Sequence, residues 1–339
     1  MIRVFEPRVT LNDTFSVLKT LLKNNISGTS PTVGEFENKL ADKFERKYAV
    51  AVSNGSTALD LAFQSLDLKK GDEVIVPSFT IISCLSAIIR SGATPVFCEV
   101  DNKSWNMTLK NVIDKKTNRT RAVLMVHLYG LAAEAEEIEN FCKENNIYLI
   151  EDSAEAHGQM VNNRPCGSFG DISTMSFYAN KHITTGEGGA VLMNNTLFSN
   201  KIKSMRNLGF NNSKRFVHDN LFWNYRLGGL QAALGISQIK NLDKTIKLKI
   251  KQGNFYNNLL ESENQYLDTQ LSSWNNVKNH YWVYGVLLKK ADIRDEVMEN
   301  LSKKGIETRP FFWPLHLQPV LSSGFPSSKS KLPISEKLG

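Results

Sequence analysis

One lysine, Lys181, lies in a sequence that suits covalent chemistry. The segment Ser176–Gly189 reads SFYANKHITTGEGG, so the lysine follows the end of a predicted strand and precedes a polar, glycine-rich turn into the next one. A lysine at the mouth of a sheet can be desolvated. Desolvation lowers the pKa of the amine and makes it a nucleophile able to form a Schiff base with an aldehyde. The segment therefore predicts a site of covalent catalysis.

A carboxylate ends another predicted strand. Asp152 follows the apolar run that begins at Tyr148. Ligands of a parallel sheet bind beyond the carboxyl ends of its strands, so Asp152 is placed to face a ligand and, if buried, needs a cationic partner. A cap for a helix that follows explains the same residue equally well.

A third site, Ser53–Ala58, reads SNGSTA between a predicted strand and a predicted helix. Gly55 permits a tight turn, and the free N–H groups of the helix start, with the hydroxyls of Ser56 and Thr57, form an anion site. Ser and Thr are also the commonest N-caps, so a capping role alone is the alternative.

Together the three sites offer the groups that pyridoxal 5'-phosphate (PLP) needs. The helix start would hold its phosphate, and Lys181 its aldehyde. Asp152 would keep the pyridine nitrogen protonated, so that the ring accepts electrons. Each site is ambiguous alone, and the combination predicts a PLP enzyme.

The elements that must position these residues alternate between short apolar runs and amphipathic stretches from about residue 46. This alternation is typical of βαβ units and predicts an α/β fold with a mostly parallel, seven-stranded sheet. Four helices are expected between the strands, at 57–66, 82–90, 109–114 and 133–145. The predicted strands are 48–53, 73–77, 94–100, 122–127, 148–152, 173–177 and 190–193.

Beyond Met193 the pattern is helical over 198–208 and 228–260, and 281–288 is predicted to be a strand. We therefore expect a large domain of residues 1–244 and a smaller α+β domain of residues 245–339.

The amino-acid composition argues against nucleic acid, metal ions and membranes as partners. The formal net charge is +7, but the 41 Lys and Arg are spread among 34 acidic residues, and no helix-turn-helix is evident, which argues against nucleic acid. The basic run Lys240–Lys251 has the spacing of a solvated helix face, with an anionic ligand as the alternative. The four cysteines lack metal-ligand spacing, so no metal is predicted and a reducing cytoplasm is expected. No apolar run approaches the roughly 18 residues of a membrane span, and no signal peptide is recognised.

The sequence resembles the DegT/DnrJ/StrS family of sugar aminotransferases from about Gly34 to about Pro319. The resemblance implies a type I PLP-dependent transferase fold, like that of aspartate aminotransferase, and a homodimer with shared active sites. The matching segments are 54–58, GDEVIVPS at 71–78, GATPVF at 92–97, Glu151-Asp152 and 176–189.

The resemblance also implies roles for individual residues. Lys181 would bear the cofactor and move protons, Asp152 would pair with the pyridine nitrogen, and Glu155 would lie near the phenolic oxygen of the ring. Ile81 stands where the family usually has an aromatic residue stacked on the ring. The implied phosphate ligands are Ser56, Thr57, Ser176 and, from the neighbouring subunit, Asn224.

Within the family, segments 224–235 and 306–316 are most similar to the GDP-perosamine synthase-like branch. These enzymes move an amino group from glutamate to C4 of a nucleotide-linked 4-keto-6-deoxy sugar, for surface polysaccharides such as lipopolysaccharide O-antigen. Arg309 and His316 are candidate substrate contacts. A salt-bridged arginine and a histidine in a packed turn are the alternatives.

Two other functions are compatible with the same fold. The deoxysugar dehydratases of the family carry His where the Schiff-base lysine would be, so Lys181 favours amino transfer. A non-catalytic regulatory protein with the same fold would leave the combination of Asp152, Ser176 and Lys181 unexplained. Relatives also continue beyond the position of Gly339, which leads us to expect a truncated or abbreviated small domain.

Overall fold

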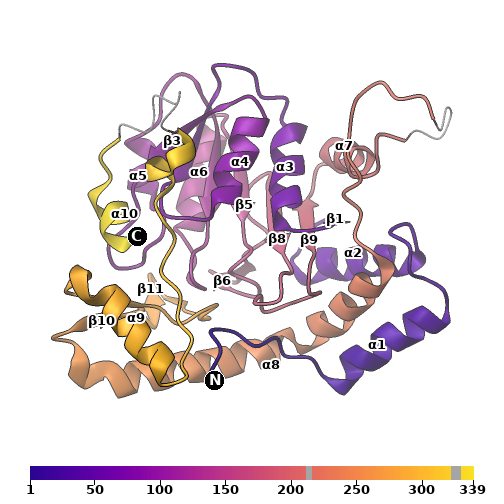
Figure 1. Cartoon of the computed structure of the whole chain (residues 1–339). Helices are drawn as coiled ribbons and strands as arrows, with labels where there is room; N and C mark the ends of the chain where they lie inside the picture. The colour runs from indigo at the N-terminus through magenta and orange to yellow at the C-terminus, as the bar shows by residue number, and fades with distance from the viewer. Residues whose placement is uncertain (211–215, 322–329) are drawn as a thin grey trace.

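The computed structural model describes residues 1–210, 216–321 and 330–339, and a seven-stranded sheet forms its centre (Figure 1). The strand order is β1-β9-β8-β5-β4-β2-β3, and β9 runs against the other six. All seven predicted strands are confirmed, as is the mostly parallel α/β fold. Their bounds are β1 Tyr48–Val52, β2 Glu73–Pro77, β3 Thr94–Cys98, β4 Thr120–Val126, β5 Tyr148–Asp152, β8 Ile172–Ser176 and β9 Gly189–Met193.

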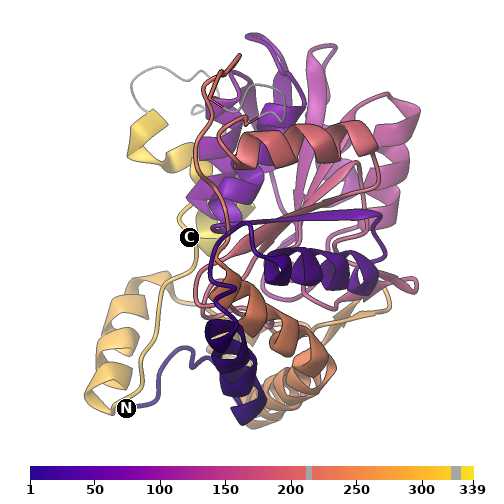
Figure 2. The ribbon, with the colours of Figure 1, turned by 90° about the vertical axis from the view of Figure 1, so that its right-hand side faces the viewer.

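Helices cover both faces of this sheet, because alternate strand residues point to opposite sides. Val74 and Val76 pack with one set of helices, while Ile75 between them packs with the other. The first set is α3 Gly55–Ser65, α4 Ile82–Arg90 and α7 Thr196–Arg206. The second is α2 Pro31–Lys43, α5 Leu109–Ile113, α6 Ala135–Glu144 and the first half of α8. Figure 2 shows α7 and α2 on opposite sides of the sheet edge.

One long helix, α8 (Gly229–Leu260), connects the sheet layer to the C-terminal part of the chain, and α1 (Leu11–Leu22) lies along it (Figure 1). Residue 245 falls inside this continuous helix, so the division into two domains there stays a prediction. The remaining elements are β6 Met160–Val161, β7 Arg164–Pro165, β10 Leu267–Thr269, β11 Ser273–Trp274, β12 Val277–Lys278, β13 Val286–Leu288, α9 Arg294–Lys303 and α10 Pro333–Leu338.

The strand predicted at 281–288 is shorter than expected, since only its end forms β13. Tyr281 has φ +49°, which an extended strand cannot contain. Its ring packs closely on the backbone of α8, where a Cβ atom on Gly253 would lie 2.4 Å from the ring. Tertiary packing therefore replaces the first part of the expected strand by a turn.

The N-terminal segment lies against the C-terminal part of the chain (Figure 2). Ile2 N–H donates to the Gly305 carbonyl at 2.7 Å, and Glu307 N–H donates to the Ile2 carbonyl at 2.8 Å. In the part of the chain that the structure describes, no helix combines the length and apolar character needed to cross a membrane.

Candidate active site

The register of the sheet brings the three predicted sites together. Val52 at the end of β1 pairs with Gly189, and Gly189 pairs with Ser176 at the end of β8. On the other side of β8, Asp152 at the end of β5 pairs with Thr174. The segments that follow β1, β5 and β8 therefore meet at one edge of the sheet, and they carry Ser56, Glu155 and Lys181.

Lys181 is held between a carboxylate and an aromatic ring. Its Nζ lies 3.6 Å from Oε1 of Glu155 and 3.7 Å from the centre of the Trp282 indole, and its side chain is 9% exposed. Burial lowers the pKa of the amine, while the charges of Glu155 and Asp152 oppose that change. The amine is thus desolvated, as the sequence predicted for a nucleophilic lysine.

Glu155 is buried and takes up a proton more readily than an ordinary glutamate. Burial raises its pKa to about 7, although the charge of Lys181 and the N–H of Tyr129 oppose the rise. That N–H donates to Oε2 of Glu155 at 2.9 Å, from a residue with φ +57°. A carboxyl group with a pKa near 7 beside an amine can exchange protons at neutral pH.

Asp152 is buried at the end of β5. Its Oδ1 accepts the N–H of Ala154 at 3.1 Å, and its Oδ2 lies 3.7 Å from the Cys84 thiol. Burial raises the pKa of Asp152, while the Ala154 N–H and the Lys181 charge oppose the rise. The chain after Asp152 forms turns, so the helix-cap alternative does not apply. The weak thiol donor leaves Oδ2 suited to a stronger, cationic partner.

The start of α3 combines a cap with an exposed hydroxyl. Asn54 caps the helix: Thr57 N–H donates to its Oδ1 at 2.9 Å, and Asn54 N–H donates to Thr57 Oγ1 at 3.2 Å. Thr57 therefore takes part in the cap, and its contact with a phosphate stays a prediction. Ser56, in contrast, is exposed and its hydroxyl contacts that of Ser83 at 2.7 Å. A cavity of about 210 Å³ opens here, lined by Ser56, Thr57, Asp60, Ser83, Arg90 and Tyr225 among others.

The other predicted residues are spread around this edge. Ile81 is the N-cap of α4 and is 42% exposed. Asn224 is exposed, and its Oδ1 accepts the N–H of Arg226 at 3.2 Å. The chain beside Asn224 contacts the α3 region, because Ser53 N–H donates to the Tyr225 carbonyl at 2.9 Å.

The two candidate substrate contacts differ in their surroundings. Arg309 is exposed, 3.3 Å from Glu307, with its guanidinium 5.3 Å from the centre of the Phe5 ring. His316 is buried, with Nδ1 2.6 Å from the Ser78 hydroxyl and Nε2 3.2 Å from Glu336. The structure therefore supplies partners of the kind that the salt-bridge and packed-turn alternatives require.

Sequence reasoning missed Trp282. The residue lies in the segment 281–288 that was predicted only as a strand, and no local signal indicated an approach to Lys181. Its Nε1–H donates to the carbonyl of Asn180 at 3.1 Å. An aromatic residue from the C-terminal part of the chain is thus a neighbour of the reactive amine.

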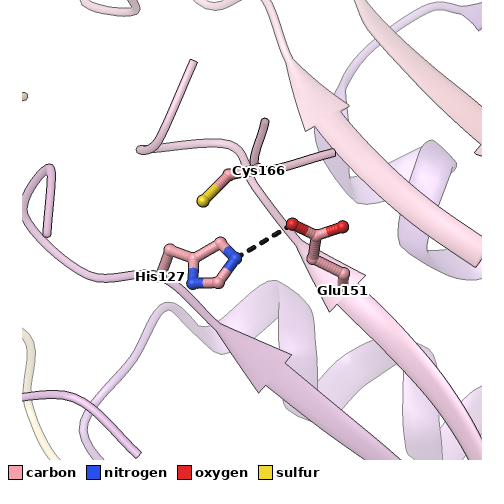
Figure 3. Close-up of side chains that lie close together, drawn as sticks. All are labelled: His127, Glu151 and Cys166. Atoms are coloured by element: carbon pink, nitrogen blue, oxygen red, sulfur yellow. Dashed lines mark hydrogen bonds and ion pairs between the residues drawn. The ribbon is translucent and has the colours of Figure 1, made fainter. Parts of the chain in front are cut away.

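Beneath Asp152 lies a buried cluster of His127, Glu151 and Cys166 (Figure 3). Ala133 N–H donates to His127 Nδ1 at 3.1 Å, so Nε2 carries the hydrogen that Glu151 accepts at 2.9 Å. Glu151 also accepts hydrogen bonds from Gly167 N–H, Phe169 N–H and the Ser173 hydroxyl. Both ring nitrogens and both carboxylate oxygens are engaged, so the cluster acts as a hydrogen-bonded support for the ends of β4 and β5.

Known proteins resemble this chain over nearly its full length. It is 37% identical to the GDP-perosamine synthase of Escherichia coli O157:H7 over 342 residues, which cover 100% of this chain and 91% of that protein. The aminotransferase TlmJ from Streptoalloteichus hindustanus superposes with a TM-score of 0.92 at 27% identity, over 100% and 91% of the two chains. The E. coli GDP-4-keto-6-deoxy-D-mannose-3-dehydratase superposes with a TM-score of 0.90 at 25% identity, over 100% and 92%.

A family description also matches residues 10–339 of the chain. This match confirms the resemblance predicted from the sequence, and with it the enzyme class. The chain belongs to the DegT/DnrJ/EryC1/StrS aminotransferase family.

Proposed function

We propose that the protein transfers an amino group from glutamate to C4 of a nucleotide-linked 4-keto-6-deoxy sugar, using PLP held by Lys181. The observation that carries this proposal is the buried amine of Lys181, 3.6 Å from Glu155 at the sheet edge where Asp152 also ends its strand. The E. coli relative named as a GDP-perosamine synthase supports the choice of sugar.

The residues at this edge fit the cofactor. Lys181 is a desolvated amine for the aldehyde, and Asp152 is a buried carboxylate whose Oδ2 has the weak Cys84 thiol donor 3.7 Å away and could accept the pyridine N–H instead. Ser56, Ser176 and the start of α3 would hold the phosphate, and Ile81 would cover a face of the ring. When bound, PLP supplies an electron-accepting ring that stabilises negative charge at the carbon bearing the amine.

Three side chains of the protein then divide the work. The Nζ amine of Lys181 would take a proton from the α-carbon of the amino donor and return one to the sugar carbon. Glu155, with its pKa raised to about 7 by burial, holds a proton close to that amine at neutral pH. Asp152 would hold the pyridine nitrogen protonated. Although burial raises the pKa of Asp152, the positive charge of that nitrogen would lower it and keep the carboxylate ionised.

Substrate recognition is assigned to the C-terminal part. Arg309 is exposed, and the Phe5 ring lies beside it. The Phe5 ring is in turn 6.0 Å from the ring of Tyr178, and Tyr178 belongs to the same loop as Lys181. A guanidinium in this position suits the phosphates of a sugar nucleotide. His316, which is buried and bonded to Ser78, would act indirectly by fixing the chain around it.

A second subunit completes the proposed site. Helix α1 carries four exposed apolar side chains at helical spacing, and the segment near Asn224 carries two more. Apolar surface of this extent favours burial against a second copy, which would bring Asn224 to the phosphate of the neighbouring site. The residues are Leu11, Phe15, Leu18, Leu22, Leu221 and Trp223.

The four cysteines are free and buried, in keeping with the cytoplasm as the place of action.

The dehydratase reaction is disfavoured by the residue at the covalent position. The fold itself does not distinguish the two reactions, since a dehydratase superposes about as well as an aminotransferase. Lys181 would bear the cofactor in the transferase reaction, and within residues 1–210, 216–321 and 330–339 no other lysine forms an ion pair with Glu155.

The absorption spectrum of purified protein with PLP tests the proposal. We expect wild type to show the band of a lysine-bound cofactor, which shifts when glutamate is added, while Lys181→Ala shows neither. The glutamate step should release 2-oxoglutarate, and keto-sugar nucleotide added next should restore the first band and yield an equal amount of amino sugar. Absence of a lysine-dependent band, or product formed over many turnovers without an amino donor, would overturn the proposal.

A further inference from the structure

Trp282 makes two contacts with the lysine segment. Its indole face lies over Nζ of Lys181, with 3.7 Å between the nitrogen and the ring centre. Its Nε1–H donates to the carbonyl of Asn180, the residue before the lysine, at 3.1 Å. One side chain thus touches the amine and also holds the backbone from which the amine extends.

The position of Trp282 is fixed by the loop that also holds Glu155. His280 N–H donates to the Gly130 carbonyl at 2.9 Å, and a Cβ atom on Gly130 would lie 2.4 Å from the backbone nitrogen of Trp282. The adjacent Tyr129 donates its N–H to Glu155 and packs its ring edge on the indole, with 5.9 Å between centres. The two groups that flank the amine therefore share one rigid support.

We propose that Trp282 is a positioning residue for Lys181. The indole face and the Glu155 carboxylate form a two-sided cage that holds the protonated amine whenever it is not covalently occupied. The role of the cage in amino transfer rests on the proposed function, but the cage itself is a property of the chain without any cofactor.

The charged groups around Lys181 do not mask the effect of the indole contact on the pKa of the amine. Asp152 and Glu155 are the acidic groups that face the amine, and His157 is a basic group close enough for the charge of Lys181 to lower its pKa. Burial lowers the pKa of His157 well below its usual value, so that imidazole is neutral near pH 7. Trp282 is itself 8% exposed, and a desolvated indole binds a cation more strongly than an exposed one.

The consequence is a preference for the charged amine. Burial lowers the pKa of Lys181, and the indole limits that decrease because it stabilises the ammonium form. Replacement of the ring by an aliphatic side chain should lower the pKa further, by about one unit for a buried contact of this kind. At a pH below both values, that shift raises the fraction of free amine about tenfold.

The test is pH-dependent acetylation of Lys181 in the full-length, cofactor-free protein, followed by mass spectrometry of its peptide. We expect Trp282→Leu to react about tenfold faster than wild type near neutral pH, with the midpoint of its pH profile about one unit lower. Trp282→Phe should shift the midpoint less, since phenyl is the weaker partner for a cation. Trp313→Leu, which alters an exposed tryptophan of the C-terminal part, should match wild type.

An unchanged midpoint in folded Trp282→Leu would overturn the proposal, because a purely structural tryptophan changes stability without changing the proton affinity of Lys181. If that variant does not fold, Trp282→Phe decides: its midpoint must fall, and an unchanged one overturns the proposal equally. No PLP is added, so failure of the proposed transferase function would leave this result standing.

Discussion

A Cβ atom added to Gly55 would lie 2.7 Å from the Cβ atom of Ser176. The two residues come from different elements, the first turn of α3 and the last position of β8. Their approach is a consequence of sheet register, since Val52, Gly189 and Ser176 lie side by side at the strand ends. The helix start and the strand end together form the surface proposed to hold the cofactor phosphate.

Gly55→Ala is therefore expected to weaken PLP binding. A methyl group at 2.7 Å from Ser176 forces the helix start and the strand end apart, so the two sets of phosphate donors no longer converge. We expect a loss of affinity of about tenfold to a hundredfold in titrations followed by absorbance. Gly34→Ala, at an exposed helix position with no neighbour within 4 Å, is the control. Unchanged affinity in Gly55→Ala would show that the phosphate binds elsewhere.

Glu155→Gln should change how stability depends on pH. Burial raises the pKa of Glu155 to about 7, so the folded protein holds a proton there that the unfolded chain releases near pH 4.5. Wild type therefore loses stability as pH rises through this window, and the variant does not. The unfolding free energy of the variant relative to wild type should increase by about 3 kcal/mol between pH 4.5 and 7.

Urea unfolding of both proteins without cofactor at several pH values measures that difference. The expected result is the slope of this difference against pH. The variant also loses stability because Lys181 no longer has its carboxylate partner, but that loss does not remove the slope. A buried lysine that loses this partner has a lower pKa, which makes the difference rise with pH in the same direction. A flat difference would mean that Glu155 titrates normally.

Asp152→Asn separates the chemistry from folding. The amide keeps the shape of the side chain but cannot hold the pyridine nitrogen protonated, so the glutamate-dependent spectral change should slow by at least about a hundredfold. The raised pKa of Asp152 means that its buried charge costs stability at neutral pH. The cofactor-free variant should consequently unfold at a urea concentration no lower than wild type. A variant that is both inactive and much less stable would point to a structural role.

The sequence predicted the sheet and the approach of Asp152 to Lys181 because the relevant signals are local. Apolar runs such as 148–152 end in a polar residue, and the strand ends of a parallel sheet gather at one edge, so Asp152 and Lys181 had to lie near one another. The placement of Trp282 depends instead on a contact between His280 and Gly130, 150 positions apart, and no local pattern encodes it. The packed-turn alternative for His316 anticipated its burial, but its partner Ser78 lies 238 positions away and is likewise not indicated by any local pattern.

Glu151→Gln tests the support beneath Asp152. Four donors converge on the Glu151 carboxylate: His127 Nε2, the N–H groups of Gly167 and Phe169, and the Ser173 hydroxyl. An amide replaces one acceptor oxygen by a donor, which leaves buried donors without acceptors.

Breaking such a buried network costs about 3–5 kcal/mol of unfolding free energy, measurable by urea denaturation. The exposed Glu144→Gln should stay within about 0.5 kcal/mol of wild type.

The carboxylate of Glu151 stabilises the fold in its charged form. Burial by itself would raise the pKa of Glu151, but the hydrogen bond from His127 and the charge of Arg46 hold it below its usual value. Wild type should therefore lose this contribution as pH falls through that lowered pKa. A small effect of Glu151→Gln at pH 7 would mean that the network relaxes around the amide.

Phe15→Glu tests the proposed second subunit. The side chain is 63% exposed on α1, between Leu11 and Leu18, which are 77% and 45% exposed on the same stripe. A charge at the centre of a buried apolar interface typically costs about 2 kcal/mol or more, so dimer dissociation should become at least about 30-fold easier in light scattering. Leu197→Glu, at a 77% exposed position on α7, is the matched control and should leave the mass unchanged.

The same variant links assembly to the site. If Asn224 completes the phosphate site of the neighbouring subunit, then the monomer formed by Phe15→Glu should bind PLP less tightly, and raising the protein concentration should restore binding. Asn224→Ala should weaken PLP binding without changing the mass, because it removes a ligand and leaves the α1 stripe intact. A monomeric wild type that binds PLP fully would contradict the shared site and leave the role of Lys181 untouched, since the amine, Glu155 and Asp152 all come from one chain.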